Sequence, residues 1–172
     1  TRGRENTLML YALLHGFKSF YSGFNVFRYV TVRSILAALT AFLMERGWRV
    51  VAVQVVSDDK EAIAGILRAW CDASLAGLVL TAGGTGLGPC DVTPEATRDI
   101  LEKDLPGLPE LMRSRGSAKT PRAALSRATA GSRGACLIGN LPGSPRGAVE
   151  SLECVLDLIP HALEMLQGGG HG

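Results

Sequence analysis

The chain has 172 residues, with 18 basic and 16 acidic side chains and a formal net charge of +2. This length suits a single domain, which buries about 70% of the surface of the unfolded chain and needs no disulfide framework. No cluster of Lys and Arg with interleaved aromatic residues indicates a nucleic-acid partner, and the longest helix-like apolar stretch, residues 35–44, is about half as long as a bilayer crossing requires. We therefore expect no nucleic-acid partner and no membrane partner, with any anion binding confined to a local site.

The first expected element is a buried strand at residues 8–14. This apolar run is short for a signal peptide, and no Ala-x-Ala cleavage site follows it. Apolar residues then recur at helical spacing within residues 33–46, and Gly47 is a typical helix stop. These apolar residues are Ile35, Leu36, Leu39, Phe42 and Leu43. Residues 48–56 follow with the apolar composition of a second strand.

A second helix is expected after residues 57–59, which read Ser-Asp-Asp. Its buried face would consist of Ala62, Ile63, Ile66, Leu67 and Trp70. Residues 75–80 predict the next strand, which leads into a glycine-rich loop at residues 81–95. Strand–helix–strand units with such short connections predict a mostly parallel sheet, so the loops after both strands should leave the sheet at the same edge.

The glycine-rich loop leads into an expected helix at residues 94–103. Residues 104–109 predict a loop because they are rich in Gly and Pro, and residues 110–113 predict a short helix. Residues 116–119 are expected to form a flexible connector.

Thr120 and Pro121 suit the start of another helix, which would carry Ser126 and Arg127 and end at Gly131. The last elements are expected to be a buried strand at residues 135–139, a loop at residues 140–147, and a helical region at residues 148–166 that bends or restarts at Pro160. We predict a single α/β domain over residues 1–166, followed by a flexible glycine-rich tail at residues 167–172.

The loop at residues 81–95 is the most informative segment of the chain. It reads Thr-Ala-Gly-Gly-Thr-Gly-Leu-Gly-Pro-Cys-Asp-Val-Thr-Pro-Glu. Glycine permits positive φ and close approach of the backbone to a ligand, and successive N–H groups of such a loop can converge on phosphate oxygens. Thr93 suits an N-cap and Pro94 the first helical position, so the N–H groups of that helix would point to the same site. Neither the Gly-Lys-Ser/Thr ending of a P-loop nor the Gly-x-Gly-x-x-Gly spacing of a Rossmann turn is present, so a different phosphate site is predicted.

Three loops are expected to meet at one edge of the sheet: residues 57–59, 81–95 and 140–147. Together they contribute the carboxylates of Asp58 and Asp91, many backbone N–H donors and the cation Arg146. Carboxylates repel a phosphate unless a cation lies between them, and Mg²⁺ bound by one or two carboxylates and by phosphate oxygens meets this requirement. The loops therefore predict a site for a nucleotide with Mg²⁺.

Each of these residues also has a purely structural interpretation. Asp58 or Asp59 could cap the helix that follows, since aspartate is a preferred N-cap. Asp91 could stabilise the turn before its helix. Arg146 could be a solvated loop charge, and residues 126–127 could belong to an ordinary helix face.

The cysteines give weaker signals. All are widely scattered, without the CxxC pairs or the His spacing of a zinc site. They are Cys71, Cys90, Cys136 and Cys154. Free thiols of this kind are typical of a reducing compartment and predict a cytoplasmic protein. Cys90 lies inside the glycine loop, but no activating group is evident beside it, so we do not expect a nucleophile.

Several short motifs occur in a fixed order along the chain. They are Thr-x-Gly-Gly-Thr-Gly from residue 81, Asp-Val-Thr-Pro-Glu from residue 91, Pro-Gly-x-x-Glu from residue 106 with Met112 and Arg113, Leu-Ser-Arg from residue 125, and Leu-Pro-Gly-x-Pro-Arg from residue 141 with Glu150. In order and spacing they resemble the molybdenum-cofactor biosynthesis family, which includes the bacterial molybdopterin adenylyltransferases and the G domains of gephyrin and the plant Cnx proteins. The resemblance extends over residues 33–166.

The resemblance implies a three-layer α/β/α sandwich that assembles as a homotrimer and binds molybdopterin and ATP with Mg²⁺. Members of the family transfer AMP to the terminal phosphate of molybdopterin and release pyrophosphate, which implies a downstream metal insertase as a further partner. Asp58 and Asp91 match the essential acidic positions, which implies that they are catalytic and bind Mg²⁺. The residues that match the ligand-binding positions are Gly83, Gly84, Thr85, Gly86, Ser126, Pro142, Gly143, Ser144, Pro145, Arg146 and Glu150.

The chain departs from the family pattern in two places. Many members have an arginine where this chain has Cys90, so one phosphate-facing charge is missing. Residues 1–32 lack the Thr-x-Ser-Asp loop and the Asp-x-Ser-Gly helix start of relatives, and residues 16–29 are aromatic and basic instead of small and acidic. Either this wall has diverged, or the N-terminal sequence is misread or translated in a shifted frame. The preserved length favours the second hypothesis, which an intact mass matching residues 1–32 as written would refute.

Adenylylation of molybdopterin is the main expectation. The alternative is a protein that binds molybdopterin or its precursor without adenylylating it, which is favoured if Cys90 and the altered N-terminus have removed the ATP site. A scaffold role such as that of gephyrin is disfavoured in a single domain without long linkers. The competence-associated nucleotide hydrolases share the glycine loop, but the Asp-Val-Thr-Pro-Glu and Leu-Pro-Gly motifs disfavour them.

Overall fold

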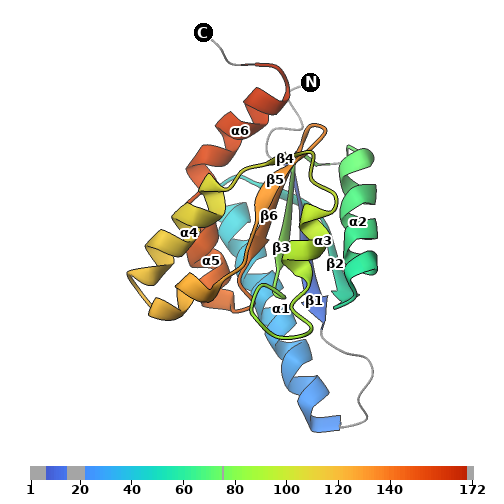
Figure 1. Cartoon of the computed structure of the whole chain (residues 1–172), viewed down its shortest axis with the longest axis vertical. Coiled ribbons are helices and arrows are strands. Elements are labelled where there is room, and N and C mark those ends of the chain that lie inside the picture. Colours follow the sequence, from blue (N-terminus) through green and yellow to red (C-terminus); the bar gives the residue numbers. More distant parts are fainter. Residues whose placement is uncertain (1–6, 15–21, 75, 170–172) are drawn as a thin grey trace.

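A computed structural model describes residues 7–14, 22–74 and 76–169, with side chains described from residue 32 onward. Parts of the predicted N-terminal wall and of the predicted glycine tail therefore lie outside the described residues. Figure 1 shows a central sheet with helices on both of its faces. Among the described residues, no helix is both long and apolar enough to span a lipid bilayer.

The described sheet has six strands, and the first four in spatial order run parallel to one another. In that order the strands are β2 (Arg49–Ser57), β1 (Thr7–Leu14), β3 (Leu78–Ala82), β6 (Cys136–Leu141), β5 (Ala130–Arg133) and β4 (Lys103–Asp104). β5 runs antiparallel to β6, and β4 runs antiparallel to β5. The predicted α/β fold with a mostly parallel sheet is thus confirmed. Because β2, β3 and β6 are parallel, the loops that follow them leave the sheet at the same edge, as predicted.

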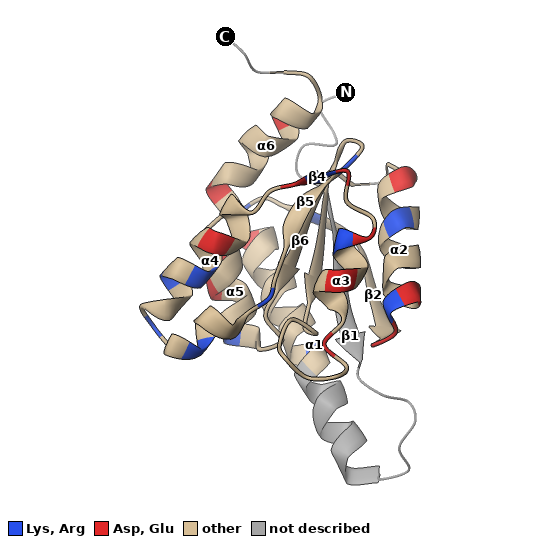
Figure 2. Cartoon of the chain, viewed as in Figure 1, with Lys and Arg blue, Asp and Glu red and all other residues tan. Residues whose placement is uncertain are grey.

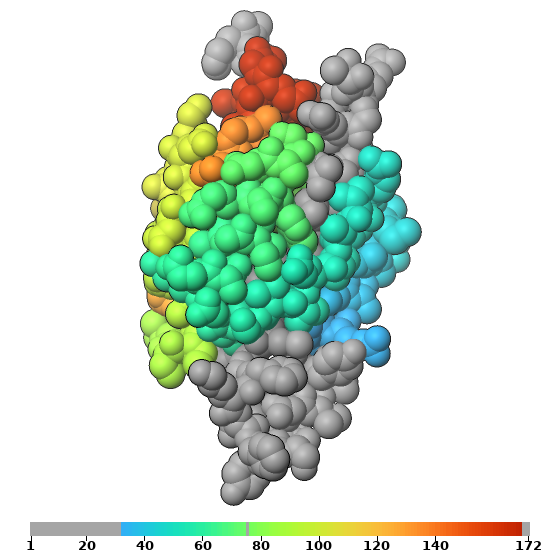
Figure 3. Space-filling view, turned by 90° about the vertical axis from the view of Figure 1, so that its right-hand side faces the viewer, coloured from blue at the N-terminus to red at the C-terminus, as the bar shows by residue number. Residues whose placement is uncertain are grey.

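The helices form the two outer layers of a three-layer α/β/α sandwich. One layer consists of α1 (Ser22–Glu45), α4 (Gly107–Ser117), α5 (Pro145–Glu153) and α6 (Ile159–Leu166), and the other of α2 (Lys60–Asp72) and α3 (Thr93–Arg98). Figure 3 shows the face of the molecule that α2 covers. The side chains of β3 alternate between the two cores: Leu78 and Leu80 belong to the α1 side and Val79 to the α2 side. A strand buried on both faces is continuously apolar, which is why the sequence predicts it well.

The end of α1 follows directly from Gly47. This residue has φ +79°, a conformation that glycine adopts without steric cost. The N–H of Gly47 donates to the carbonyl of Met44 at 3.1 Å, and the N–H of Trp48 donates to the carbonyl of Leu43 at 3.0 Å. These two bonds form a Schellman motif, and the buried Trp48 packs in the same core as Leu43. The predicted helix stop is confirmed, although the helix begins earlier than the predicted residue 33.

The predicted strand at residues 48–56 and the helix that follows it are both confirmed. Asp59 is the N-cap of α2, and its Oδ1 accepts a hydrogen bond from the N–H of Ala62 at 2.8 Å. The buried face of α2 is rotated slightly from the predicted one. Its buried residues are Ile63, Ala64, Leu67 and Cys71, with Ile66 and Trp70 partly buried against them. The next strand, β3, starts at Leu78 and continues through Ala82, so it lies later in the chain than predicted.

The helix predicted at residues 94–103 is shorter than expected. α3 starts at Thr93 and ends at Arg98, and Val92 rather than Thr93 occupies the N-cap position. Lys103 and Asp104 instead form β4, which pairs with β5. The prediction failed because a two-residue edge strand has no periodicity of its own and is defined only by its partner.

The helix predicted from Thr120 to Gly131 is wrong. A 3₁₀ helix, η1 (Pro121–Leu125), replaces its first part, and Ser126 follows with extended backbone. Gly131 lies inside β5, where an added Cβ would collide with the carbonyl oxygen of Lys103. This glycine therefore permits the close approach of β4 and does not end a helix.

Helical structure in the last third of the chain begins earlier than predicted. β6 extends through Leu141 and α5 begins at Pro145, so the loop predicted at residues 140–147 is reduced to residues 142–144. The predicted restart at Pro160 is confirmed, because η2 (Leu156–Leu158) separates α5 from α6 and Pro160 lies in the first turn of α6.

The helix predicted at residues 110–113 extends over all of α4, so Gly116 is helical and not part of a connector. In the predicted tail, the N–H of Gly169 donates to the carbonyl of Glu164 at 3.0 Å, and residues 170–172 lie outside the described part.

Candidate functional site

The two loops that follow β3 and β6 pack against each other through their backbones. Gly83 and Gly84 have φ of +102° and +63°, which explains why both positions are glycine. The N–H of Gly83 donates to the carbonyl of Leu141 at 3.0 Å, and a Cβ on Gly143 would lie 3.2 Å from the Cα of Gly83. A side chain at Gly143 would therefore require a small shift of one loop away from the other.

Asp91 is held by the turn that precedes it. Its Oδ2 accepts a hydrogen bond from the N–H of Gly88 at 2.7 Å, and its own N–H donates to the carbonyl of Gly88 at 3.0 Å. A Cβ on Gly86 or Gly88 would lie 2.8 or 2.9 Å from the same carboxylate oxygen. The later glycines of the loop therefore leave space for the Asp91 carboxylate.

A buried polar network fixes the strands behind these loops. The side-chain NH₂ of Asn140 donates to the hydroxyl oxygens of Thr81 and Thr97, each at 2.9 Å. Its Oδ1 accepts from the N–H of Thr129 at 3.1 Å. Asn140 is only 1% exposed, so these bonds satisfy an amide that would otherwise be costly to bury. The network joins β3, β6 and α3 at the point where both loops begin.

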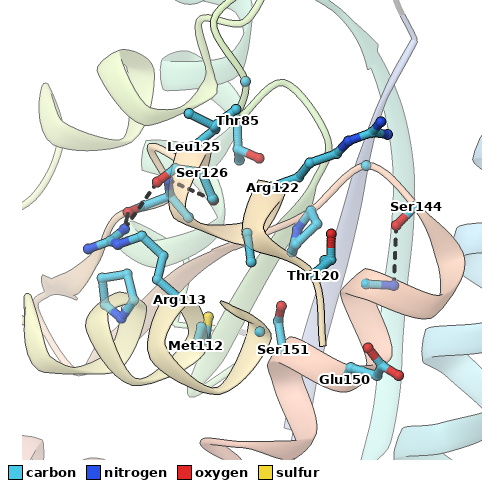
Figure 4. A pocket seen from close by; sticks show the side chains of 18 of the residues that line it. Thr85, Met112, Arg113, Thr120, Arg122, Leu125, Ser126, Ser144, Glu150 and Ser151 are labelled. Carbon is cyan, nitrogen blue, oxygen red and sulfur yellow. Dashed lines mark hydrogen bonds between the residues drawn. The ribbon is translucent and has the colours of Figure 1, made fainter. Parts of the chain in front are cut away.

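A pocket with a volume of about 410 Å³ opens beside the two loops. Figure 4 shows that its other walls come from α4, from η1 and from the first turns of α5. The predicted site residues that line it are Gly84, Thr85, Gly86, Asp91, Ser126, Pro142, Gly143, Ser144 and Glu150. Four predicted residues do not line it: Asp58, Gly83, Pro145 and Arg146. The structure thus brings most of the predicted set to one cavity.

One wall of the pocket was not predicted. It consists of α4, η1 and the residues between them, and it adds four cations: Arg113, Arg115, Lys119 and Arg122. Apolar side chains such as Met112 and Leu125 lie among them (Figure 4). In Figure 2, blue segments of the ribbon mark the Lys and Arg positions on α4 and on the stretch that follows it. The available signal in the sequence is that residues 113–122 contain four basic residues and no acidic residue.

Glu150 connects this wall to α5. Its Oε1 lies 2.9 Å from Nε of Arg146 and 3.1 Å from Nζ of Lys119. Hydrogen bonds from Arg146 and then from Lys119 hold the pKa of Glu150 below its ordinary value. Arg146 itself is 84% exposed, so it contacts the pocket only through Glu150. Of these two predicted residues, Glu150 lines the pocket and Arg146 does not, and their side chains are paired with each other.

Asp58 has a different position from Asp91. It directly follows β2, the outermost strand, and β1 lies between β2 and β3. Two interstrand spacings, about 10 Å, therefore separate the ends of β2 and β3. Asp59 is the helix cap, which leaves the half-buried Asp58 outside that structural role.

The described part of the chain has no cluster of three or more His, Cys, Asp or Glu side chains suited to a metal, so a metal site here would need ligand oxygens as well as Asp58 and Asp91.

Cys90 immediately precedes Asp91, and Glu95 lies in the first turn of α3, which follows it. The Cys90 thiol is free and exposed. The carboxylate of Glu95 forms an ion pair with Arg127, whose Nη1 donates a hydrogen bond to it. Desolvation raises the pKa of Glu95, but hydrogen bonds from its own backbone N–H and from Arg127 outweigh it, so the pKa is lower than usual. Among the described residues, no Lys or Arg forms an ion pair with the carboxylate of Asp91.

Known proteins resemble this chain over most of its length. Residues 6–161 match the family model of a probable molybdopterin binding domain. The molybdopterin adenylyltransferase of Helicobacter pylori strain J99 is 43% identical over 115 residues, which are 67% of this chain and 65% of that protein. The molybdenum cofactor synthesis protein cinnamon of Drosophila melanogaster is 43% identical over 112 residues, 65% of this chain and 19% of the relative. The chain thus spans just under two thirds of the bacterial relative and a smaller part of the insect protein.

Solved structures also resemble this chain. The molybdopterin biosynthesis enzyme MoaB of Thermus thermophilus is 44% identical, with a TM-score of 0.80 and coverage of 94% of this chain and 96% of that one. The molybdopterin biosynthesis Mog protein of Mycobacterium ulcerans is 30% identical, with a TM-score of 0.79 and coverage of 95% and 97%. The match to the family model and these relatives agree with each other. The chain therefore belongs to the molybdenum-cofactor biosynthesis family of molybdopterin-binding domains that includes MogA and MoaB.

Proposed function

We propose that this protein is a molybdopterin adenylyltransferase of molybdenum-cofactor biosynthesis. It transfers AMP from ATP to the terminal phosphate of molybdopterin, with Mg²⁺ as the metal. The observation that carries the proposal is the position of Asp91, whose carboxylate is fixed by the glycine loop at the wall of a pocket that also contains four cationic side chains.

The pocket has surfaces suited to both parts of such substrates. Gly84, Thr85 and Gly86 line it, and backbone N–H groups of a loop of this kind can bind phosphate oxygens. Met112 and Leu125 provide an apolar wall, which suits a flat heterocyclic ring. The cations of α4 and η1 would neutralise phosphate charge. These features support a ligand with a ring at one end and phosphate at the other.

The donor chemistry also fits Mg²⁺. Asp91 lines the pocket, and no described Lys or Arg forms an ion pair with its carboxylate, which is therefore suited to a metal. Asp58 comes from the same edge of the sheet. Mg²⁺ prefers one or two carboxylates together with substrate phosphate oxygens. In this proposal Asp91 and Asp58 hold the ion, which when bound neutralises charge on the reacting phosphates.

The proposed reaction needs no protein nucleophile. An oxygen of the terminal phosphate of molybdopterin attacks the α-phosphorus of ATP, a new P–O bond forms, and the bond to the β-phosphate breaks to release pyrophosphate. The protein contributes positioning and fixed positive electrostatic potential, which are its usual contributions to such transfers. The glycine loop positions the phosphates, and the basic wall stabilises the negative charge that develops on the leaving pyrophosphate.

Cys90 supports one second candidate, a protein that binds molybdopterin without adenylylating it. The exposed Cys90 leaves the position before Asp91 without a positive charge. A pyrophosphate-release assay with the purified chain, ATP and Mg²⁺ separates the two functions. Transfer predicts pyrophosphate release that requires molybdopterin, whereas a binding protein predicts saturable molybdopterin binding in calorimetry without any pyrophosphate release.

The remaining properties of the proposed enzyme are a homotrimeric assembly, a cytoplasmic location and a downstream metal insertase that receives the product. We propose also that residues 1–166 act as one domain, with residues 167–172 as a flexible tail. Light scattering of the purified protein tests the assembly directly. A mass three times that of the 18.2 kDa chain is expected, and a monomeric mass would contradict it.

A further inference from the structure

Arg127 lies behind the glycine loop and outside the pocket. Ser126 and Ala128, its two neighbours, line the pocket, whereas Arg127 does not. Ser126 has extended backbone (φ −70°, ψ 125°), and successive side chains of an extended segment point to opposite sides. This short segment therefore forms the pocket wall with one side and reaches the back of the glycine loop with the other.

The guanidinium group of Arg127 contacts both ends of the loop that contains Asp91. Its Nε donates to the carbonyl of Gly86 at 2.6 Å, and its Nη2 donates to the carbonyl of Asp91. Its Nη1 pairs with the carboxylate of Glu95, and its backbone N–H donates to the carbonyl of Thr85 at 2.9 Å. The guanidinium group is planar and rigid, so these contacts fix the positions of their partners relative to one another. We call this set of contacts the frame. Gly86 and Asp91 are thus held at a set distance across the loop.

The segment that carries Arg127 is itself fixed from the other side. Nη1 of Arg113 donates to the carbonyl oxygens of Ser126 and Ala128 at 3.3 and 3.1 Å. Figure 4 shows Arg113 of α4 directed at this segment. Two guanidinium groups therefore connect α4 to the glycine loop through residues 126–128.

We propose that Arg127 is a positioning residue for Asp91. It contacts the loop and not the pocket, and it fixes the geometry in which the Gly88 N–H and the space beside Gly86 direct the carboxylate. The proposal rests on the proposed function of Asp91, but the order of the loop can be measured without any substrate. If the frame is lost, Asp91 is still present, but we expect its carboxylate to have no single well-defined position.

Arg133 offers a matched control. It also pairs with a carboxylate and a carbonyl: Nε and Nη2 lie 2.8 and 3.1 Å from the carboxylate of Asp72, and Nη1 donates to Ile100 at 3.3 Å. Its side chain is 24% exposed, compared with 30% for Arg127. It does not line the pocket and contacts no part of the glycine loop. A general loss of stability would affect Arg133→Gln and Arg127→Gln alike.

Hydrogen exchange and steady-state kinetics of the full chain test the proposal together. In Arg127→Gln we expect the amides of residues 86–91 to exchange about tenfold faster, since charge-assisted hydrogen bonds are lost. We expect kcat to fall about 100-fold because Asp91 is misplaced, with KM for ATP within about threefold of the wild type. Arg127→Lys should recover part of both effects, and Arg133→Gln should match the wild type in both.

Two results would overturn the proposal: wild-type exchange of residues 86–91 in Arg127→Gln, or an equal fall of kcat in Arg127→Gln and Arg133→Gln. If Arg127→Gln does not fold, Glu95→Gln removes one partner of Arg127 and should still accelerate exchange of the same amides, and unchanged exchange there would refute the frame. If the wild-type chain releases no pyrophosphate, the proposed function fails, while the exchange comparison still decides whether Arg127 orders the loop.

Discussion

Asp91 and Asp58 lie at the same edge of the sheet, but their surroundings differ. The carboxylate of Asp91 accepts a hydrogen bond from the N–H of Gly88, and Arg127 donates to the backbone carbonyl of Asp91. Asp58 follows the outermost strand, β2, and β1 lies between it and the pocket loops. One edge of the parallel sheet thus carries the glycine loop with Asp91, which we call the rigid wall, and Asp58 two strands away, which we call the distant wall. We propose that both walls face one phosphate ligand.

The largest effect is expected from Asp91→Ala, which removes the carboxylate from the rigid wall. We expect adenylyl transfer to fall by about three orders of magnitude, because several kcal/mol of charge stabilisation at the reacting phosphates would be lost. Pyrophosphate release in the coupled ATP and molybdopterin assay measures it. Asp157→Ala, which changes an exposed carboxylate on η2, is the control and should retain full activity. Retained activity in a folded Asp91→Ala would refute the assignment.

Asp58→Asn tests whether the distant wall belongs to the same site. We expect about a 100-fold fall in kcat, smaller than for Asp91, because one of two proposed metal ligands keeps an oxygen but loses its charge. The adjacent Asp59 is a sharp control, since its carboxylate caps α2. Asp59→Ala should lower the free energy of unfolding by about 1 kcal/mol and leave kcat unchanged. If Asp58→Asn behaves like Asp59→Ala, Asp58 is only a structural residue.

Several strands and the loops after them could be predicted from the sequence, but the spatial order of the strands could not. Apolar runs and glycine or proline breakers are local signals, so β2, β3, β6 and the loops after them could be predicted. Spatial order is not local: that β1 separates Asp58 from the glycine loop follows only from strand pairing. Sequence reasoning therefore placed the two carboxylates at one edge correctly, but could not give the spacing between them.

The wall made by α4 and η1 illustrates a second limit. Arg113, Lys119 and Arg122 show no spacing that distinguishes ligand-facing cations from solvated ones. The same region was wrongly predicted as a helix ending at Gly131, because β5 is short and poor in β-branched residues. These cations line the pocket because α4 packs against α5 and η1, and this packing is not visible in the sequence. A run of basic residues without acids was the one signal present.

The basic wall should contribute to substrate capture more than to chemistry. We expect the double variant Lys119→Gln, Arg122→Gln to raise KM for the anionic substrates about tenfold at low salt, with a smaller effect on kcat. The difference should shrink as ionic strength rises, because exposed charges are screened. Arg68→Gln removes an exposed cation on α2 and serves as the control. A KM that is unchanged at low salt would show that this wall does not bind substrate.

The smallest effect is expected from Glu150, which pairs with Lys119 of the basic wall and with Arg146 of α5. Hydrogen bonds from Arg146 and Lys119 lower its pKa in the folded protein, so its contribution to stability is present above the unfolded pKa, about 4.3, and is lost as the pH falls through the folded value. We expect wild type and Glu150→Gln to differ slightly in Tm at neutral pH, because exposed ion pairs contribute little. The two Tm values should converge in acid. A difference that grows as the pH falls would contradict this sign.

The central claim is that the rigid wall and the distant wall form one site. A crystal of the protein soaked with Mn²⁺ in place of Mg²⁺ and a non-hydrolysable ATP analogue tests it most directly, since anomalous scattering locates the metal. We predict that Mn²⁺ is bound by the carboxylates of Asp91 and Asp58 and by phosphate oxygens of the analogue, with those phosphates against residues 84–86. Metal or nucleotide bound away from Asp91, or bound at Asp91 with Asp58 uninvolved, would contradict it.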